Sequence, residues 1–344
     1  MMKDIRILGI ETSCDETAVS VVENGQRVLA NLVASQIKVH QRYGGVVPEV
    51  ASRKHIEVIA SLVDEALKEA GLTAPEMDAV AVTHTPGLIG ALLVGVSFAK
   101  AYAYGLGKPL IGVNHLEAHI YANFLTARPP VFPAVCLVVS GGHTSLLYMK
   151  DHRRFDILGQ TRDDAAGEAF DKVARFLGLG YPGGPAVQKA AQSGTAGIYH
   201  LPRVFLDRND YEFSFSGLKT ATINLWNKLK KNGEEAGVND LAAEFQEALV
   251  DVLVEKTINA ARQMGVGQIL LAGGVAANAR LRERITGKAG ESGIAVHMPS
   301  LALCTDNAAM VACAGYYQYL ERDFAGLDLN AFPHLGLAVK NACG

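Results

Sequence analysis

Apolar residues in this chain alternate between short, strand-like runs and longer helical faces. Mostly apolar runs, each followed by a polar or glycine-rich turn, occur at 5–10, 79–83, 110–113, 134–139 and 268–272. Runs of this kind are typical of buried strands. Apolar residues at helical spacing predict helices over 56–70, 89–105, 168–177, 240–264 and 307–319. Because the two kinds of segment alternate, the pattern predicts an α/β fold.

The strand pattern starts twice. A strand, a polar turn and a second strand occupy 5–22, and the same arrangement returns at 134–149, after a proline-rich stretch. The chain has 344 residues, which suits two domains of ordinary size. We therefore expect one domain over 1–128, a second over 129–305, and a C-terminal helix and tail over 306–344 that packs back on the first.

Composition excludes several classes of protein. Hydrophobic residues make up 49% and charged residues 19% of the chain, which is ordinary for a folded globular protein and not for a disordered or fibrous one. The net charge is -3, so no global basic field favours nucleic acid. The uncharged stretches at 79–99 and 129–149 are interrupted by proline and glycine, which argues against membrane spans. Five cysteines without a C-x-x-C pair, and no signal-peptide pattern, predict a cytoplasmic protein with reduced thiols.

Three polar or glycine-rich turns follow apolar strands, at 11–17, 140–144 and 272–278. In such turns backbone N–H groups can approach phosphate oxygens closely. One Gly-Gly turn is more often a plain tight turn, but three in one α/β chain indicate a nucleotide site. Neither the P-loop pattern nor the dinucleotide fingerprint is present, so another scaffold would hold the nucleotide.

His115 and His119 stand four residues apart on an expected helix, at a spacing that suits one metal ion. The alternative interpretation is that the two histidines are only partly buried polar residues on an amphipathic helix. A metal needs a third ligand, and Asp306 is the best candidate elsewhere in the sequence, although an Asp at a helix start is often only a cap. Glu117 does not stand where a zincin has its base, which argues against a protease.

An acidic segment at 163–172 places Glu168 and Asp171 on one helix, beside Lys172. Surface salt bridges are one interpretation, and close packing of its small residues against a ligand or backbone is the other. The aromatic segment at 210–219 fits either a strand or a binding loop.

Taken together, these motifs closely resemble one family, the bacterial tRNA N6-adenosine threonylcarbamoyltransferases, formerly described as O-sialoglycoprotein endopeptidases. The segments that carry the resemblance lie at 9–17, 43–49, 51–53, 86–90, 115–119, 139–143, 163–172, 181–185, 213–219, 272–278 and 304–307. Thr85 departs from the glycine that the family usually has before Pro86, and it predicts a different local turn.

The resemblance implies an actin-like ATPase (ASKHA) fold, with two ribonuclease-H-like domains around a nucleotide cleft. It implies one metal ion per subunit, iron or zinc with Fe2+ favoured, held by His115, His119 and Asp306. It also implies an adenine nucleotide, threonylcarbamoyl-AMP or ATP, bound at Val139, Ser140, Gly141, Gly142, His143, Asp171, Gly184, Gln188 and Asn278.

The activity that the resemblance implies is transfer of a threonylcarbamoyl group from threonylcarbamoyl-AMP to N6 of adenosine 37 in tRNAs that read ANN codons. The products are t6A and AMP. In this interpretation Asp15 or Glu16 receives the N6 proton, with a structural or phosphate–water role as the alternative for each. An actin-like ATPase and a nucleotide-dependent scaffold stay open as other function classes, whereas a metalloprotease leaves the nucleotide turns without a role.

The implied partners are tRNA, a shorter actin-like paralogue, a P-loop ATPase and a separate threonylcarbamoyl-AMP synthase. Because a net charge of -3 attracts tRNA weakly, we expect the chain to need accessory subunits. We expect the paralogue to dock on the helix over 56–70. The candidate tRNA contacts are cations of the central segment: Arg153, Arg154, Arg203, Arg208 and Lys219.

Overall fold

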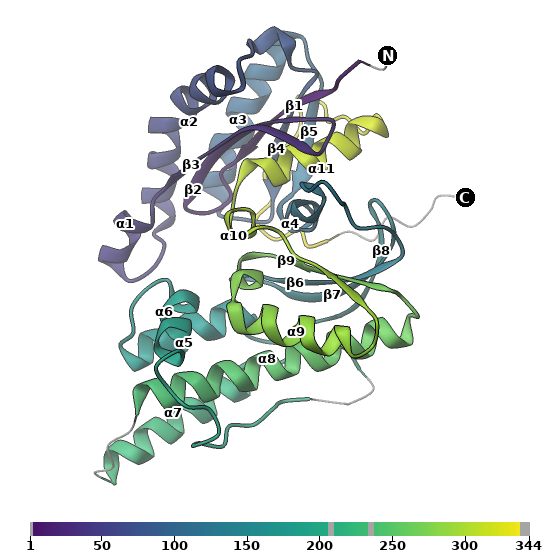
Figure 1. Cartoon of the computed structure of the whole chain (residues 1–344). Coiled ribbons are helices and arrows are strands. Elements are labelled where there is room, and N and C mark those ends of the chain that lie inside the picture. The colour runs from purple at the N-terminus through teal and green to yellow at the C-terminus, as the bar shows by residue number, and fades with distance from the viewer. Residues whose placement is uncertain (1–2, 206–209, 233–236, 338–344) are drawn as a thin grey trace. The chain divides into compact units, whose positions relative to one another are not determined.

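The computed structural model describes residues 3–205, 210–232 and 237–337, and these residues form two compact units (Figure 1). Unit 1 contains residues up to 130 together with the segment from 299 onward, and unit 2 contains 131–298. The boundary at 298 comes earlier in the chain than the expected one at 305, because helix α10 (Leu301–Cys304) belongs to unit 1.

Unit 1 is built on a five-stranded mixed sheet with the order β3-β2-β1-β4-β5. Its strands are β1 (Arg6–Glu11), β2 (Glu16–Glu23), β3 (Arg27–Ser35), β4 (Ala79–Thr85) and β5 (Leu110–Asn114). Strand β2 is antiparallel to both β1 and β3, whereas β4 runs parallel to β1 and β5 parallel to β4. The short helix α1 (Ile37–His40) follows β3.

Helices cover both faces of this sheet. On one face, α2 (Pro48–Ala70) and α3 (Ile89–Leu106) pack on Leu8 and Ile10 of β1. On the other face, α11 (Ala308–Leu320) approaches β1 so closely that a Cβ at Gly9 would lie 2.4 Å from the Ala308 carbonyl oxygen. Helix α4 (His115–Tyr121) packs against α11. The sheet therefore lies between two layers of helix, with a glycine at the tightest contact.

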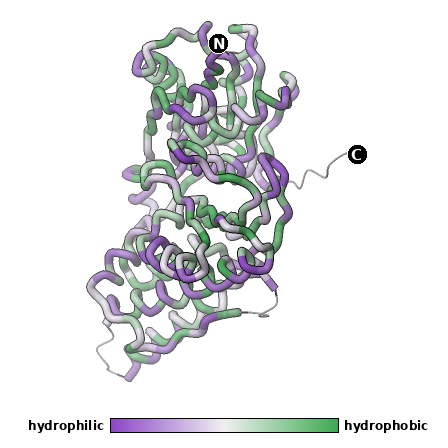
Figure 2. Tube along the Cα trace, turned by 45° about the vertical axis from the view of Figure 1, so that its right-hand side comes forward, coloured by the Kyte–Doolittle hydropathy of each residue, from purple (hydrophilic) through white to green (hydrophobic). Residues whose placement is uncertain are grey.

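Unit 2 repeats this strand order when its sheet is read from the opposite edge, as β8-β7-β6-β9-β10. Its strands are β6 (Ala134–Val139), β7 (Thr144–Asp151), β8 (Arg154–Gln160), β9 (Gln268–Ala272) and β10 (Ala295–His297). Its helices are α5 (Ala166–Leu177), α6 (Gly183–Ala191), α7 (Ser216–Lys231), α8 (Val238–Gln263) and α9 (Ala279–Gly290). Figure 2 shows hydrophobic stretches of the trace gathered inside each unit, with hydrophilic stretches toward its outside. The predicted α/β fold with a repeated beginning is confirmed.

Helix α3 is strongly apolar. Within the described residues it is the one helix whose length and composition would suit a membrane span. Its buried side, which includes Ala91, Leu92 and Ala99, packs on β4 and α2. In this structure α3 therefore contributes to the core of unit 1.

Two of the elements that differ from the predicted pattern show why the pattern misses them. Helix α2 begins at Pro48, well before the predicted start at Ile56. The prediction missed these first turns because they carry Glu49, Ser52 and Arg53 and show no apolar face. Strand β3 has no predicted counterpart, since it lies at the edge of its sheet and most of its residues are at least partly exposed. In both cases the apolar spacing that reveals an element in sequence is weak.

Candidate metal centre and nucleotide-binding turns

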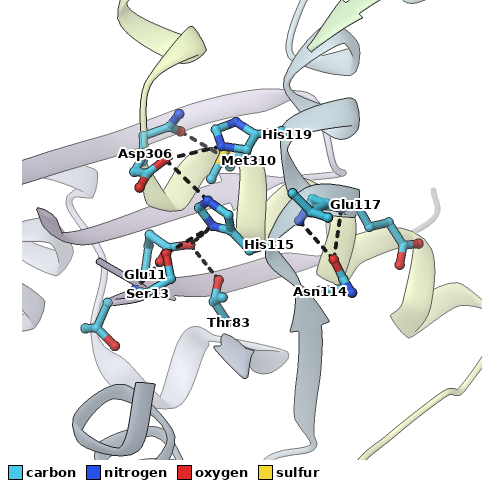
Figure 3. A network of polar contacts seen from close by, with 12 residues as sticks. Glu11, Ser13, Thr83, Asn114, His115, Glu117, His119, Asp306 and Met310 are labelled. Atoms are coloured by element: carbon cyan, nitrogen blue, oxygen red, sulfur yellow. Dashed lines mark hydrogen bonds and ion pairs between the residues drawn. The ribbon is translucent and has the colours of Figure 1, made fainter. Parts of the chain in front are cut away.

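The two histidines of the predicted metal site lie at the start of α4, directly after β5. Asn114, between the two elements, caps the helix by accepting hydrogen bonds from the backbone N–H groups of Leu116 and Glu117. The ring centroids of His115 and His119 are 4.6 Å apart. Glu117, on the same helix, points away from both rings (Figure 3). The helix therefore supplies two imidazoles and no carboxylate base of the zincin type.

Asp306 approaches this histidine pair from the loop before α11. Its Oδ1 lies 3.2 Å from Nε2 of His119 and 3.4 Å from Nε2 of His115 (Figure 3). The cap of α11 is the next residue, Asn307, whose side chain accepts from the N–H of Met310. The sequence alternative, that Asp306 merely caps a helix, is therefore wrong.

One ligand atom from each of His115, His119 and Asp306 lies within 4.8 Å of the others. Two imidazole nitrogens and one carboxylate oxygen are a donor set that suits Zn2+ or Fe2+, and three protein ligands leave a coordination position open for substrate. The residues present thus fit the metal ion that the family resemblance implies.

Glu11, the last residue of β1, orients the first of these imidazoles. Its buried carboxylate lies 2.9 Å from Nδ1 of His115 and also accepts from the Thr83 hydroxyl at 2.6 Å and the Ser13 N–H at 2.5 Å. A carboxylate behind a ligating histidine fixes the ring so that its other nitrogen faces the metal. Sequence analysis missed this role. The available signal was a carboxylate at the end of an otherwise apolar buried strand.

The charges of the metal-free centre follow from burial and from these contacts. Burial alone lowers the pKa of His115, but Asp306 and Glu11 on its two sides outweigh burial and hold that pKa well above its ordinary value. Burial lowers the pKa of His119, which is therefore neutral. Burial opposes ionisation of Asp306, but His115 and His119 hold its pKa below the ordinary value. One imidazolium thus lies between two carboxylates.

Asp15 and Glu16, the candidate proton acceptors, belong to the turn between β1 and β2. Glu16 accepts a hydrogen bond from the Ser35 hydroxyl at 3.1 Å. Burial, with the nearby negative charges of Asp306 and Asp15, raises the pKa of Glu16 to about 9. At neutral pH, without a cation nearby, Glu16 holds a proton and is not free to accept one.

Gly87 of the 86–90 motif packs against this same turn. A Cβ at Gly87 would lie 2.6 Å from the carbonyl oxygen of Ser13. Thr85, the departure from the family pattern, ends β4 without a positive φ, and its hydroxyl donates to the Leu335 carbonyl. The backbone of Thr85 is that of an ordinary strand end, and a difference from the turn of relatives with glycine here stays a prediction.

The predicted nucleotide turns of unit 2 lie side by side. Strands β6 and β9 are parallel and paired, with Val138 opposite Ala272, so both turns begin at the same edge of the sheet. Gly273 has a φ of 90° and packs so tightly that a Cβ there would lie 2.3 Å from the Val139 carbonyl oxygen. Gly274, the next residue, faces open space.

The other predicted nucleotide residues surround these two turns. Ser140 and His143 close the first turn, since the Ser140 N–H donates to the His143 carbonyl at 2.8 Å and the His143 N–H donates to the Ser140 hydroxyl at 3.2 Å. Between them, Gly141 and Gly142 are exposed, and nothing would meet a Cβ at either. A Cβ at Gly167 of α5 would lie 2.6 Å from the Ser140 carbonyl oxygen. The small residues of the acidic segment therefore pack against backbone, one of their two predicted interpretations.

Asp171, Gly184, Gln188 and Asn278 connect the neighbouring helices. The Asp171 carboxylate accepts from the N–H of Gly183 at 2.7 Å, at the start of α6, where Gly184 faces open space. Gln188 accepts from the N–H of Ala279 at 2.7 Å, and Asn278 caps α9. A cavity of about 350 Å³ adjoins them, lined by residues of α6, α8 and α9 that include Gln188 and Ala279.

The cations of the central segment are mostly engaged by carboxylates. Arg203 forms ion pairs with Glu244 and Asp251, and Lys219 pairs with Asp164 at 2.7 Å. Lys172 bridges Asp164 and Glu168, as the salt-bridge interpretation predicted. Arg153 is buried, Arg154 is exposed, and Arg208 lies outside the described residues. This leaves Arg154 as the exposed cation among the described candidates for tRNA contact.

The fold resembles that of solved proteins of low sequence identity. HypF from T. kodakarensis matches with a TM-score of 0.59 and 17% identity over 95% of this chain and 49% of that one. Component A of (R)-2-hydroxyglutaryl-CoA dehydratase from Acidaminococcus fermentans matches with a TM-score of 0.53 and 14% identity over 92% of this chain and 99% of that one. Fold and site together define an actin-like ATPase-fold protein with a candidate histidine–aspartate metal centre.

Sequence comparison identifies the family. The sequence model described as TsaD: tRNA N6-adenosine threonylcarbamoyltransferase matches residues 27–313. Proteins with that description are 64% identical in Syntrophomonas wolfei, over 97% of this chain and 98% of the relative, and 58% identical in Moorella thermoacetica, with the same two coverages. The chain belongs to the tRNA N6-adenosine threonylcarbamoyltransferase family, and the predicted resemblance is confirmed.

Proposed function

We infer that this protein transfers the threonylcarbamoyl group of threonylcarbamoyl-AMP to N6 of adenosine 37 in tRNAs that read ANN codons. A bond forms between N6 and the carbonyl carbon, and the bond from that carbon to the phosphate oxygen breaks. The oxygen leaves with the electron pair as AMP, and the N6 proton passes to an acceptor. The convergence of His115, His119 and Asp306, in a chain of this family, is the observation that carries the proposal.

In unit 1, His115, His119 and Asp306 would hold the metal ion, which we propose to be Fe2+ rather than Zn2+. A bound divalent metal supplies Lewis-acid polarisation of the carbonyl group. Glu11 holds His115 in the orientation that presents Nε2 to the ion. Of the two candidate proton acceptors, we propose Asp15, because in the metal-free chain Glu16, with a pKa of about 9, already carries a proton.

In unit 2, the backbone of Gly141, Gly142 and Gly274 would bind the phosphate of the donor. The open space beside these glycines supports the proposal, because backbone N–H groups approach a phosphate closely only where side chains are absent. Asp171, Gly184 and Gln188 would bind the nucleoside, together with Val139, Ser140, His143 and Asn278. The cavity beside Gln188 has room for a nucleobase.

The proposed partners follow from family membership and from charge. A separate synthase would supply the adenylate, and a shorter actin-like paralogue and a P-loop ATPase would complete the machinery in the cytoplasm. We propose that the paralogue docks on α2 and α3, where Ile56, Ile89 and Leu93 expose between 42% and 65% of their area.

The test is mass spectrometry of tRNA nucleosides after incubation of unmodified tRNA with this protein, the accessory proteins, threonine, bicarbonate and ATP. We expect t6A with the wild-type chain and a background level with His119→Ala. ATP hydrolysis by the isolated chain, together with no t6A in the complete mixture, would contradict the proposal and favour an actin-like ATPase. ATP-dependent assembly with the partners, without turnover or t6A, would favour a scaffold.

A further inference from the structure

The backbone of the acidic turn between β1 and β2 is held from three directions. The Ser13 carbonyl accepts from the N–H of Leu88 at 2.8 Å, and the Asp15 carbonyl accepts from the N–H of Gln36 at 3.1 Å. Between them, the Cys14 carbonyl contacts Nε2 of His55 at 3.0 Å. Of these three contacts, the one from His55, on α2, is the one that a side chain makes.

The tautomer of His55 follows from its partners. A carbonyl oxygen only accepts, so Nε2 must carry the hydrogen that binds Cys14. Nδ1 is then an acceptor, and the Thr17 hydroxyl, 2.7 Å away, donates to it. The side chain is fully buried, and burial lowers its pKa, which keeps the ring neutral.

A second buried histidine continues the same network. The Gln36 amide nitrogen lies 3.4 Å from the Ala51 carbonyl and 3.5 Å from Nδ1 of His55, so the Gln36 oxygen points the other way. That oxygen accepts from Nε2 of His40 at 3.2 Å, and Nδ1 of His40 accepts from the N–H of Val47 at 3.3 Å. Along this hydrogen-bond network the N–H groups therefore all donate in one direction, from Val47 at the start of α2, through His40, Gln36 and His55, to the acidic turn.

We propose that His55 is a positioning residue that holds the acidic turn, and with it Asp15 and Glu16, in the conformation needed for transfer. The proposal rests on the proposed function, because the turn matters only if its carboxyl groups serve the reaction. His55 acts through the Cys14 carbonyl, and its contacts with that carbonyl and with the Thr17 hydroxyl fix the tautomer that donates. It lies outside the metal ligands, so its loss should leave metal binding intact.

The experiment compares His55→Gln with His55→Met. Glutamine can place an N–H near the position of Nε2, whereas methionine fills a similar volume without a donor. We expect His55→Met to lower kcat about 10- to 100-fold, the scale of a misplaced reacting group, with little change in the KM for tRNA or in metal content. We expect His55→Gln to restore most of kcat. His84→Met is the matched control, since the His84 side chain contacts the Asn330 carbonyl and the Phe332 ring rather than a residue of the turn, and kcat should stay unchanged.

The outcomes separate this proposal from the proposed function. If the wild-type chain forms no t6A, the function fails. If the wild type is active and both His55 variants keep full kcat, the positioning role fails. A second measurement needs no variant: 15N NMR of the histidine rings should find His55 neutral with its hydrogen on Nε2, and the Nδ1–H tautomer would overturn the proposal even if His55→Met does not fold.

Discussion

His115 lies between two carboxylates, with Glu11 on Nδ1 and Asp306 on Nε2. Because these charges hold its pKa well above the ordinary value, the ring is protonated at neutral pH in the metal-free protein. A ligating imidazole must release the proton on Nε2. We therefore expect metal binding to release about one proton, and affinity to rise about tenfold per pH unit below that pKa. Calorimetry in two buffers of different ionisation heat measures this, and an identical heat in both buffers would contradict it.

The ligand assignment itself predicts a loss of metal in single variants. Removal of one of three protein ligands leaves an incomplete site, so His119→Ala should lose most bound metal while circular dichroism stays that of the wild type. His84→Ala is the control, since His84 lies outside the cluster. Elemental analysis of the purified variants checks the prediction, and stoichiometric metal in His119→Ala would exclude this site.

Glu16 makes stability depend on pH in a defined direction. Its pKa is about 9 in the folded metal-free chain and about 4.5 when unfolded, so between these values the unfolded state releases a proton that the folded state keeps. Stability should therefore fall as pH rises through this window. Glutamine mimics the protonated form, so Glu16→Gln should stabilise the metal-free protein at pH 8 by an amount on the order of a few kcal/mol, with no gain below about pH 4.

Urea unfolding at both pH values measures the effect of Glu16→Gln. The exposed Glu69 of α2 offers the control, because Glu69→Gln should change stability little at either pH. Equal gains for Glu16→Gln at pH 4 and pH 8 would show that packing rather than ionisation is responsible.

The residues of the metal cluster could be predicted from sequence, whereas the residues that orient them through hydrogen bonds could not. His115 and His119 reveal themselves by spacing on a helix, because residues four apart share a face. Glu11 and Thr83 act only through the pairing of β1 with β4, which brings together positions 72 residues apart. The choice of Asn307 over Asp306 as the helix cap depends on where α11 begins, and helix ends are poorly marked in sequence.

At the level of elements, the predicted pattern succeeds where one side of an element is buried. Strands β1, β4 and β6 are almost wholly buried, and their apolar runs predict them. The prediction misses the edge strand β3 and the polar first turns of α2, because neither has an uninterrupted apolar side. The aromatic segment at 210–219 is divided: Phe213 forms an isolated bridge to Thr161, and α7 starts at Ser216.

The turn after β9 predicts different outcomes for two adjacent glycines. Gly274 faces open space, so Gly274→Val should fold normally and weaken binding of an adenine nucleotide about tenfold or more, by blocking close backbone approach. Gly287→Val is the control, since it adds the same side chain in open space on α9. Binding calorimetry checks both, and unchanged affinity in Gly274→Val would place the nucleotide elsewhere.

At Gly273, in the same turn, a side chain should impair folding rather than nucleotide binding. Its positive φ and its contact with the Val139 carbonyl leave no room for a side chain. We expect Gly273→Val to destabilise unit 2, which thermal unfolding would detect. A variant that unfolds like the wild type would contradict the close packing of the two turns.

For the molecule as a whole, charge predicts weak binding of tRNA by the isolated chain. The net charge is -3, and ion pairs within the chain already engage Arg203 and Lys219. Phosphate contacts normally supply much of the affinity for a nucleic acid. Filter binding at two salt concentrations, with and without the accessory subunits, should show tight binding only with them. Tight and strongly salt-dependent binding by this chain alone would contradict the prediction.

The repeated architecture was readable from sequence, because a strand, a turn and a strand begin each unit. In both units the chemistry of interest starts at that first turn, between β1 and β2 and between β6 and β7. The return of the chain to unit 1 near residue 299 was harder to locate. No proline-rich stretch marks it, so the expected boundary at 305 lies later in the chain than the observed one at 298.

The discontinuous course of unit 1 also has a consequence in time. Asp306 follows His119 by 187 residues, so a ribosome that adds about 5–20 residues per second makes the aspartate roughly 10 to 40 s after the histidines. Until then the nascent chain carries two imidazoles and no third ligand. The strand that ends at Glu11 also lacks its cover of α11 during this interval. A metal ion held by these three residues, as proposed, would therefore be captured late in biosynthesis, only after residues 131–298 of unit 2 have been translated.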